Sequence, residues 1–204
     1  MKKSILFISM LMAPILSSYG YWGTGVSTYP MLMDNKFLST EITGDFSANG
    51  GLGFQGRYTQ KINQSTIVDA GVGFSGGDRT GRIFASIDYE IFPDYQKQPR
   101  ISTKAFYENS AEDGQRKNII GVIPTFSKGF NFWGQEAYPY ASVPMGVSLD
   151  KNNKSYDTFL KLSLGISGKI PYESLKHLTA SVEGTLNIKD SYSGLYMALH
   201  FPIN

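Results

Sequence analysis

The strongest constraint on this chain is a two-residue alternation of apolar and polar residues that begins near Phe46 and recurs almost to the C-terminus. In its first clear stretch, one parity carries the apolar residues Phe46, Ala48, Leu52, Phe54 and Tyr58, and the other carries Asp45, Ser47, Asn49, Gln55, Arg57 and Thr59. Successive strand residues point to opposite faces, so such a segment has one apolar and one polar face. Repeated many times, this pattern predicts a β-sheet closed into a barrel.

The first twenty residues have the features of a signal peptide. Lys2 and Lys3 form a basic start, an apolar stretch covers residues 5–16, and the small residues Ser18 and Gly20 predict cleavage after Gly20. This stretch is too short for a membrane-spanning helix, which needs about 20 residues. We therefore expect a leader at 1–20 and a single β-barrel domain at 21–204.

Charge and cysteine content exclude several classes of function. Two of the 19 basic residues lie in the leader, which leaves 17 against 17 acidic residues and predicts a neutral mature chain. Nucleic acid is not an expected partner, because phosphate binding needs a surplus of Lys and Arg. The absence of cysteine excludes disulfides, a thiolate nucleophile and a thiolate metal site. We expect no cofactor.

The alternation predicts about ten strands in one array, most of them long enough for a tilted membrane crossing of about 9–11 residues. Eight strands are the alternative, if neighbouring segments merge, because single-chain bacterial barrels have even strand numbers. The expected ranges are 21–29, 44–61, 65–75, 81–92, 99–108, 118–127, 136–149, 157–169, 177–188 and 194–202.

Prolines and charges allow finer predictions within this array. Pro124, Pro139 and Pro144 fall inside expected strands, and because proline cannot donate to a ladder, we expect bulges there. Matching apolar and charged faces across two hairpins sets Arg57 opposite Asp69 and Glu90 opposite Arg100. With both termini at one end, the connections 30–43, 76–80, 109–117, 150–156 and 189–193 share the other end.

Three features place the apolar face outside and the polar face inside. Small residues crowd the polar face, as a narrow lumen requires: Gly51, Gly53, Gly71, Gly73, Ser163 and Gly165. Charges on that face have neighbours of opposite sign, which burial demands. Aromatic residues lie near expected strand ends, as in the girdles of membrane barrels: Phe46, Tyr58, Phe74, Tyr107, Phe126, Tyr156 and Phe201.

With these features the chain resembles the small bacterial outer-membrane β-barrel group. The resemblance implies a closed antiparallel up-and-down transmembrane β-barrel in the outer membrane of a Gram-negative bacterium. It also implies outer-membrane lipid, lipopolysaccharide and the barrel-insertion machinery as partners. Members of the group end on an aromatic residue in the last strand, whereas here Phe201 is followed by Pro202-Ile203-Asn204.

The candidate site is the set of charged residues that line the expected lumen. It forms either a narrow water-filled passage or a salt-bridged plug. The plug is favoured because side chains already fill the interior of an eight-strand barrel, so a barrel of eight to ten strands has little free space inside. The set comprises Arg57, Asp69, Arg82, Asp88, Glu90, Arg100, Lys104, Glu108, Lys161 and Glu183.

Catalysis is not predicted. The two histidines, His177 and His200, fall at the strand ends that lie on the same side of the barrel as the chain termini, away from the outer leaflet. We expect both of them to pack in the lumen. A metal pair lacks a third ligand. The favoured function is therefore a structural or narrow porin-like outer-membrane barrel. The alternatives are a secreted soluble barrel that binds an apolar ligand through Phe54, Val72 and Leu164, and an outer-membrane lipid-modifying enzyme.

Overall fold

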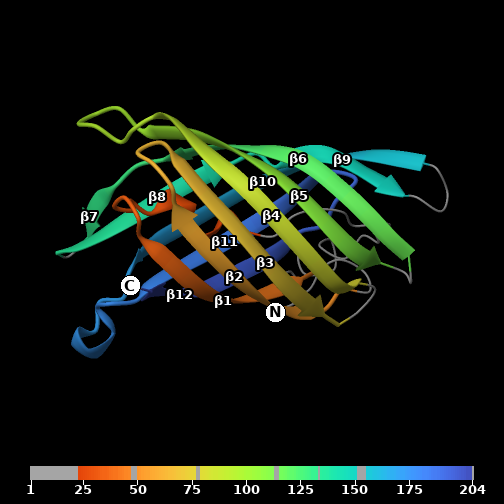
Figure 1. Cartoon of the computed structure of the whole chain (residues 1–204), viewed down its shortest axis with the longest axis horizontal. Helices are drawn as coiled ribbons and strands as arrows, with labels where there is room; N and C mark the ends of the chain where they lie inside the picture. The colour runs from red at the N-terminus through yellow and green to blue at the C-terminus, as the bar shows by residue number, and fades with distance from the viewer. Residues whose placement is uncertain are drawn as a thin grey trace, which may run out of the picture.

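Ten antiparallel strands close into a barrel in the computed structural model (Figure 1). The structure describes residues 23–46, 50–76, 79–112, 115–132, 134–150 and 155–203, so the expected signal peptide and its cleavage site lie outside the described residues. The strands are β1 (Lys36–Asp45), β2 (Leu52–Lys61), β3 (Thr66–Ser75), β4 (Arg79–Phe92), β5 (Arg100–Glu112), β6 (Gln115–Ser127), β8 (Gln135–Ser142) continued by β9 (Met145–Asp150), β10 (Ser155–Lys169), β11 (Thr179–Lys189) and β12 (Gly194–Ile203).

Each strand pairs with its neighbours in the chain, and the last strand pairs with the first. The β1–β12 seam runs from Lys36 opposite Ile203 to Asp45 opposite Gly194. The short strand β7 (Phe130–Phe132) pairs only with β8, as a hairpin beyond the barrel wall. The expectation of a closed, up-and-down, ten-strand antiparallel barrel is confirmed.

The two ends of the barrel differ in what they carry. We call the end where β1 begins and β12 finishes the terminal end, and the opposite end, with the connection at 46–51, the turn end. The connections after β3, β5, β9 and β11 also lie at the turn end, as expected. The expected connection at 30–43 is wrong, because most of it belongs to β1.

The first expected strand is also wrong. In place of a strand at 21–29, the described residues from Gly23 onward form a loop and a 3₁₀ turn, η1 (Gly25–Thr28). The expected second strand at 44–61 contains the end of β1, the connection at 46–51 and β2. The connection at 46–51 has an even number of residues, so the apolar residues of β1 and β2 both fall at even-numbered positions. The alternation therefore continued across the connection and concealed the boundary between the two strands. Asn49-Gly50, a common turn dipeptide, was the available signal.

The three prolines produce no bulge. Pro124 in β6 and Pro139 in β8 keep the register of their ladders, and Pro144 sits in the two-residue gap between β8 and β9, across which the register with β6 is unchanged. Each proline carbonyl accepts a backbone N–H, from Val143, Lys128 and Lys161 respectively. The missing proline N–H therefore removes one bond from each pair without displacing the strand.

Both expected registers are wrong by two residues, which preserves the faces. Arg57 lies opposite Gly71 instead of Asp69, and Glu90 lies opposite Ser102 instead of Arg100. A shift of two leaves every side chain on its predicted side of the sheet, since the period of a strand is two. The intended ion pairs still form, as diagonal contacts.

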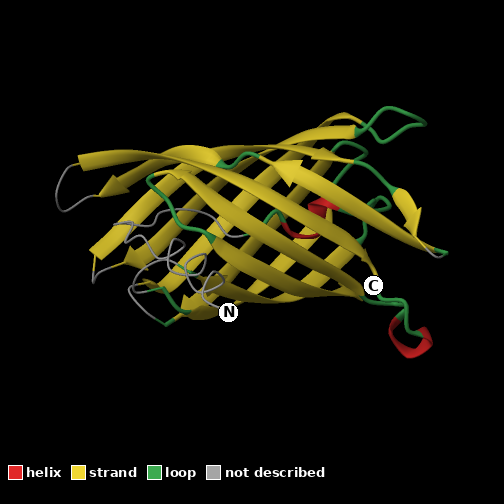
Figure 2. Cartoon of the chain, turned by 180° about the vertical axis from the view of Figure 1, so that it is seen from behind, coloured by secondary structure: helices red, strands yellow, loops and turns green. Residues whose placement is uncertain are grey.

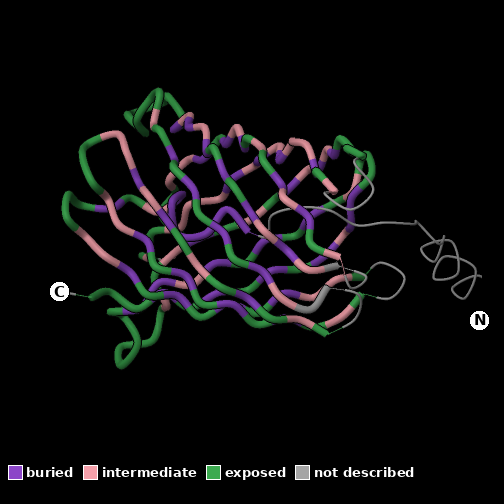
Figure 3. Tube along the Cα trace, turned by 45° about the vertical axis from the view of Figure 1, so that its right-hand side comes forward, coloured by how far each residue is buried: buried purple, intermediate pink, exposed green. Residues whose placement is uncertain are grey.

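Burial alternates from residue to residue along the strands (Figure 3). The polar side chains are buried inside the barrel and the apolar ones are exposed outside. Val182 and Leu199 are 38% and 40% exposed, whereas their neighbours Ser181 and Ala198 are buried. All seven aromatic residues expected near strand ends are exposed on the outer face. The outside of the barrel is therefore an apolar surface.

Glycines make room for large aromatic side chains inside the wall. Phe106 lies directly opposite Gly121, and a Cβ added at Gly121 would lie 2.4 Å from the Met145 carbonyl oxygen and 2.7 Å from the Phe106 ring. Phe84 opposite Gly71 and Tyr140 opposite Gly165 repeat this arrangement. Each aromatic ring covers a glycine on the next strand, which lets a narrow barrel enclose it.

We predict that Gly121→Val lowers the free energy of unfolding in detergent by about 1–3 kcal/mol, because overpacking displaces Phe106 or the neighbouring backbone. Gly184→Val is the matched control, since a Cβ at Gly184 meets no atom within 4 Å. Equal stability of the two variants in urea titrations would contradict the role of the glycine–aromatic pairs.

Candidate functional site

The lumen contains a segment of the chain that precedes the first strand. Residues 23–28 are buried inside the wall, and residues 29–31 lead out to the terminal end, where Pro30 is exposed. Figure 2 shows η1 enclosed by the strands. All four residues of η1 are buried. We call residues 23–31 the lumen segment.

The lumen segment is held by polar side chains from the wall. The Thr24 N–H donates to Glu183 Oε2 at 2.8 Å, and the Thr24 carbonyl accepts from Lys104 Nζ at 2.6 Å. The Arg57 guanidinium donates to the Gly23 carbonyl at 3.3 Å. These groups satisfy backbone atoms that have no ladder partner inside the barrel.

A chain of buried ion pairs crosses the middle of the lumen. Arg57 Nε lies 2.8 Å from Glu41 Oε1, and Arg57 Nη1 lies 3.4 Å from Asp69 Oδ1. Asp69 Oδ2 in turn accepts from Lys104 Nζ at 2.9 Å. Tyr196 donates its hydroxyl to Glu41 at 2.9 Å. Charges alternate in sign along this chain, which offsets the desolvation that burial imposes on each of them.

A second ionic group lies toward the terminal end. Arg100 Nη2 lies 3.2 Å from Asp88 Oδ1, and Arg100 Nε lies 2.6 Å from Glu90 Oε2. Arg100 also donates to Ser102 at 2.9 Å. The group stands close to the entrance of the barrel, where Glu90 is partly exposed.

The structure places the ten candidate residues as follows. All except Glu90 are buried, and Arg57, Asp69 and Lys104 form one group while Asp88, Glu90 and Arg100 form another. Glu183 accepts from Thr24 and Tyr140, and Arg82 donates to Thr43 at 3.4 Å. Lys161 lies over the Tyr192 ring, 3.5 Å from its centroid. Glu108 is buried near the turn end.

Sequence reasoning missed two buried charges, Glu41 and Lys117, and the lumen segment itself. Glu41 was assigned to a connection, although Ser39, Glu41 and Thr43 alternate with Leu38 and Ile42. Lys117 was assigned to the connection 109–117, but β5 and β6 extend almost to the tip of that hairpin. Added to the ten candidates, these two make a set of six acidic and six basic residues.

Part of the lumen is apolar, which the sequence did not predict. Phe84, Phe106, Ile119, Ile123 and Phe159 form one buried cluster on β4, β5, β6 and β10. Val26 and Met31 of the lumen segment pack with Phe37 and Ile67 in a second cluster at the terminal end. The lumen segment is therefore fixed by polar contacts at its start and by apolar packing at its end.

The two histidines occupy different environments. His200 is buried, with Nδ1 2.6 Å from Ser39 Oγ and Nε2 2.8 Å from Ser181 Oγ. Ser181 continues through Ser167 to Thr28 of the lumen segment. His177 is exposed in the loop after η2 (Glu173–Leu175), so the expectation that it packs in the lumen is wrong. That loop projects beyond the wall (Figure 2).

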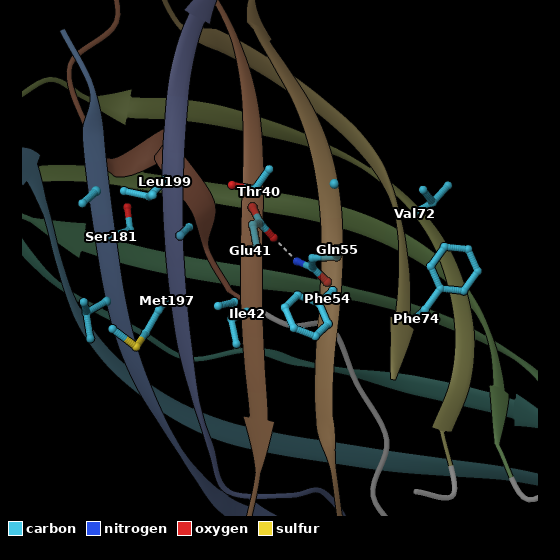
Figure 4. A pocket seen from close by; sticks show the side chains of 14 residues that line it. Thr40, Glu41, Ile42, Phe54, Gln55, Val72, Phe74, Ser181, Met197 and Leu199 are labelled. Atoms are coloured by element: carbon cyan, nitrogen blue, oxygen red, sulfur yellow. Dashed lines mark hydrogen bonds between the residues drawn. The ribbon is translucent and has the colours of Figure 1, made fainter. Parts of the chain in front are cut away.

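The outer face carries an apolar groove of about 670 Å³ over β11, β12, β1, β2 and β3 (Figure 4). Ile42, Phe54 and Met197 line it, while Glu41 and Gln55 hydrogen-bond to each other behind the wall. Phe54, Val72 and Leu164 are 63%, 48% and 55% exposed on the outside. The expectation of a soluble barrel with these three residues around an internal ligand cavity is therefore wrong.

Two absences hold for the part of the chain that the structure describes. No helix there is long and apolar enough to cross a membrane. No group of three or more histidine or acidic residues there is arranged to hold a metal ion.

Comparisons with known proteins give distant structural likenesses. No protein-family model matches the chain, and no curated protein matches it. A de novo designed transmembrane β-barrel is similar at 9% identity and a TM-score of 0.41, covering 85% of this chain and 98% of that one. Ail, the attachment invasion locus protein of Yersinia pestis, solved with the heparin analogue sucrose octasulfate, is similar at 11% identity and a TM-score of 0.27, covering 82% and 97%. The strand pairing, and not these likenesses, establishes the fold.

We predict that Arg57→Ala lowers the free energy of unfolding by about 3–5 kcal/mol, because Glu41 and Asp69 stay buried but lose the cation that pairs with both of them. Arg116→Ala is the control: Arg116 is exposed near the turn end and donates to Asn109, so its loss should cost only about 0.5 kcal/mol. Denaturant titration of both variants in detergent measures the difference. A loss below about 1 kcal/mol for Arg57→Ala would show that the ion-pair chain does not stabilise the barrel.

Proposed function

We propose that this protein is an integral outer-membrane β-barrel of structural type, closed in its resting state and without enzymatic activity. The observation that carries the proposal is the lumen segment, which is bound by side chains from β2, β5 and β11. A general porin keeps its lumen open to water, whereas this lumen is occupied by the chain itself.

The outer surface supports a membrane location. Large apolar side chains are exposed around the barrel, among them Leu38 on β1, Ile87 on β4, Leu164 on β10 and Leu186 on β11. In water such a surface would aggregate, whereas in a bilayer it contacts acyl chains. With the expected leader, a β-barrel of this kind belongs in the outer membrane of a Gram-negative bacterium, with the terminal end in the periplasm.

The partners follow from the same placement. Lipid covers the apolar face, and lipopolysaccharide meets the exposed Arg116, which lies with Asn109 and Asn118 on the outer face near the turn end. The barrel-insertion machinery would read β12, whose Phe201 lies two residues before the strand ends at Ile203. A lipid-modifying enzyme is disfavoured, because the serines beside both nitrogens of His200 are buried.

The test is recovery from outer membranes, followed by gel mobility with and without heating and by conductance in planar bilayers. We expect a heat-dependent mobility shift, because a closed barrel resists unfolding at room temperature, and no sustained conductance. Recovery of the protein from the soluble periplasmic fraction would refute the membrane location. Large, permanently open steps would refute the closed state.

We further predict that Val182→Arg, near the middle of β11, lowers stability in lipid vesicles by about 2–4 kcal/mol. Tyr156→Arg, at the turn end of β10, should cost only about 0–1 kcal/mol, because a charge near the interface reaches water. Both side chains are exposed on the outer face. Equal effects of the two substitutions would contradict burial of the outer face in lipid.

A further inference from the structure

We propose that the lumen segment, residues 23–31, is a displaceable plug, and that the barrel conducts small ions of both signs when the plug is withdrawn. The inference rests on the proposed membrane location, since conduction needs a barrel that spans a bilayer. It adds a second state to the closed barrel described above.

The polar contacts of the plug are contacts that water can replace. Thr24 and Gly23 bind to the side chains of Glu183, Lys104 and Arg57 and take no part in the β-ladder. The hydroxyl of Thr24 lies 3.3 Å from that of Ser142. Withdrawal would leave charged and hydroxyl groups facing an aqueous space, which is their preferred surrounding. No strand pairing would be lost.

The wall has its own ion pairs, which do not depend on the plug. Glu41 stays paired with Arg57, and Asp69 with Lys104, because all four residues belong to strands. The wall is therefore stable with or without the segment, as a pore with two states requires. A lumen filled only by apolar side chains would collapse or stay dry instead.

The plug is tethered at the terminal end, where withdrawal would take it out of the barrel. Residues 32–35 connect it to β1, and Asp34 there has a φ of 66°, in the left-handed region. Leu32 and Met33 are exposed at this connection. Water opposes loss of the apolar anchor, in which Val26 and Met31 pack against Phe37 and Ile67 and the Tyr29 ring packs against the same cluster and against Tyr138. It therefore sets how often the plug leaves.

An entrance already exists beside the plug. A cavity of about 270 Å³ at the terminal end is lined on one side by the plug residues Ser27, Thr28 and Tyr29, and on the other by Glu90 and Arg100. Ions would enter here and pass Asp69, Lys104 and the other central charges. Because acidic and basic side chains are balanced along this route, the open state should select only weakly between cations and anions.

The first test weakens the anchor without touching a strand. In Val26→Asp a charge replaces a fully buried apolar side chain of the plug, which should drive the segment out. We expect the open probability in planar bilayers to rise at least tenfold over the natural sequence. Val26→Ile, which keeps the anchor apolar, is the matched control and should stay closed. A Val26→Asp barrel that shows the heat-dependent gel shift and remains silent would overturn the proposal.

The second test locks the plug in place. The Thr28 hydroxyl lies 2.8 Å from that of Ser167 on β10, and the natural chain has no cysteine, so Thr28→Cys with Ser167→Cys offers a single disulfide. Added to Val26→Asp, the oxidised lock should abolish conductance, and a reductant should restore it. Conductance that is unchanged by oxidation, with the crosslink verified by mass spectrometry, would place the ion path elsewhere and overturn the proposal.

A third measurement needs no altered anchor. A single Thr24→Cys in the otherwise natural chain should react with a membrane-impermeant thiol reagent while the barrel is still folded, because withdrawal exposes this position. Protection until the barrel unfolds would overturn the proposal. Failure of the natural sequence to enter outer membranes would instead refute the proposed function, so the two outcomes are distinguishable.

Discussion

The fold depends on one buried cation, Arg57, between two carboxylates. Arg57 contacts Glu41 on one neighbouring strand and Asp69 on the other, so it joins β1, β2 and β3 across the lumen side of the sheet. The same guanidinium reaches the Gly23 carbonyl, which couples the wall to the segment inside. Burial makes each of these charges costly alone and favourable together. Closing the barrel with polar side chains inside is possible because such groups are complete.

Size and shape impose a second constraint, which the glycines meet. A ten-strand barrel has little free interior, yet this one encloses the rings of Phe84, Phe106 and Tyr140 together with a nine-residue segment. Each ring lies over a glycine on the adjacent strand, so the wall is thinnest where the contents are largest. The sequence therefore alternates not only polar with apolar residues but also small with large ones inside.

The sequence predicted the fold class and the inward charges, because both depend on a period of two that persists under small errors of position. The total of ten strands agrees because the false strand at 21–29 replaced β1, which was missed. The strand register could not be predicted from the sequence. A shift of two residues keeps Arg57 and Asp69 on the same face, so the pattern of faces does not distinguish the expected pairing from the observed one. The lumen segment could not be predicted either, because Thr24 is fixed by Ser142 and Glu183, which lie more than a hundred positions away in the sequence. Local pattern carries no information about such contacts.

The position of the lumen segment directly before β1 has a consequence for assembly. The seam between β1 and β12 joins the two ends of the chain, so it carries the largest loop-closure entropy and is expected to form last. A segment that enters a finished cylinder must be threaded lengthwise, whereas one that lies against a still-open sheet is simply wrapped. We therefore expect the sheet to curve around the lumen segment during assembly, because Arg57 and Lys104 bind this segment from the wall. Pairing of β1 with β12 would then close the barrel.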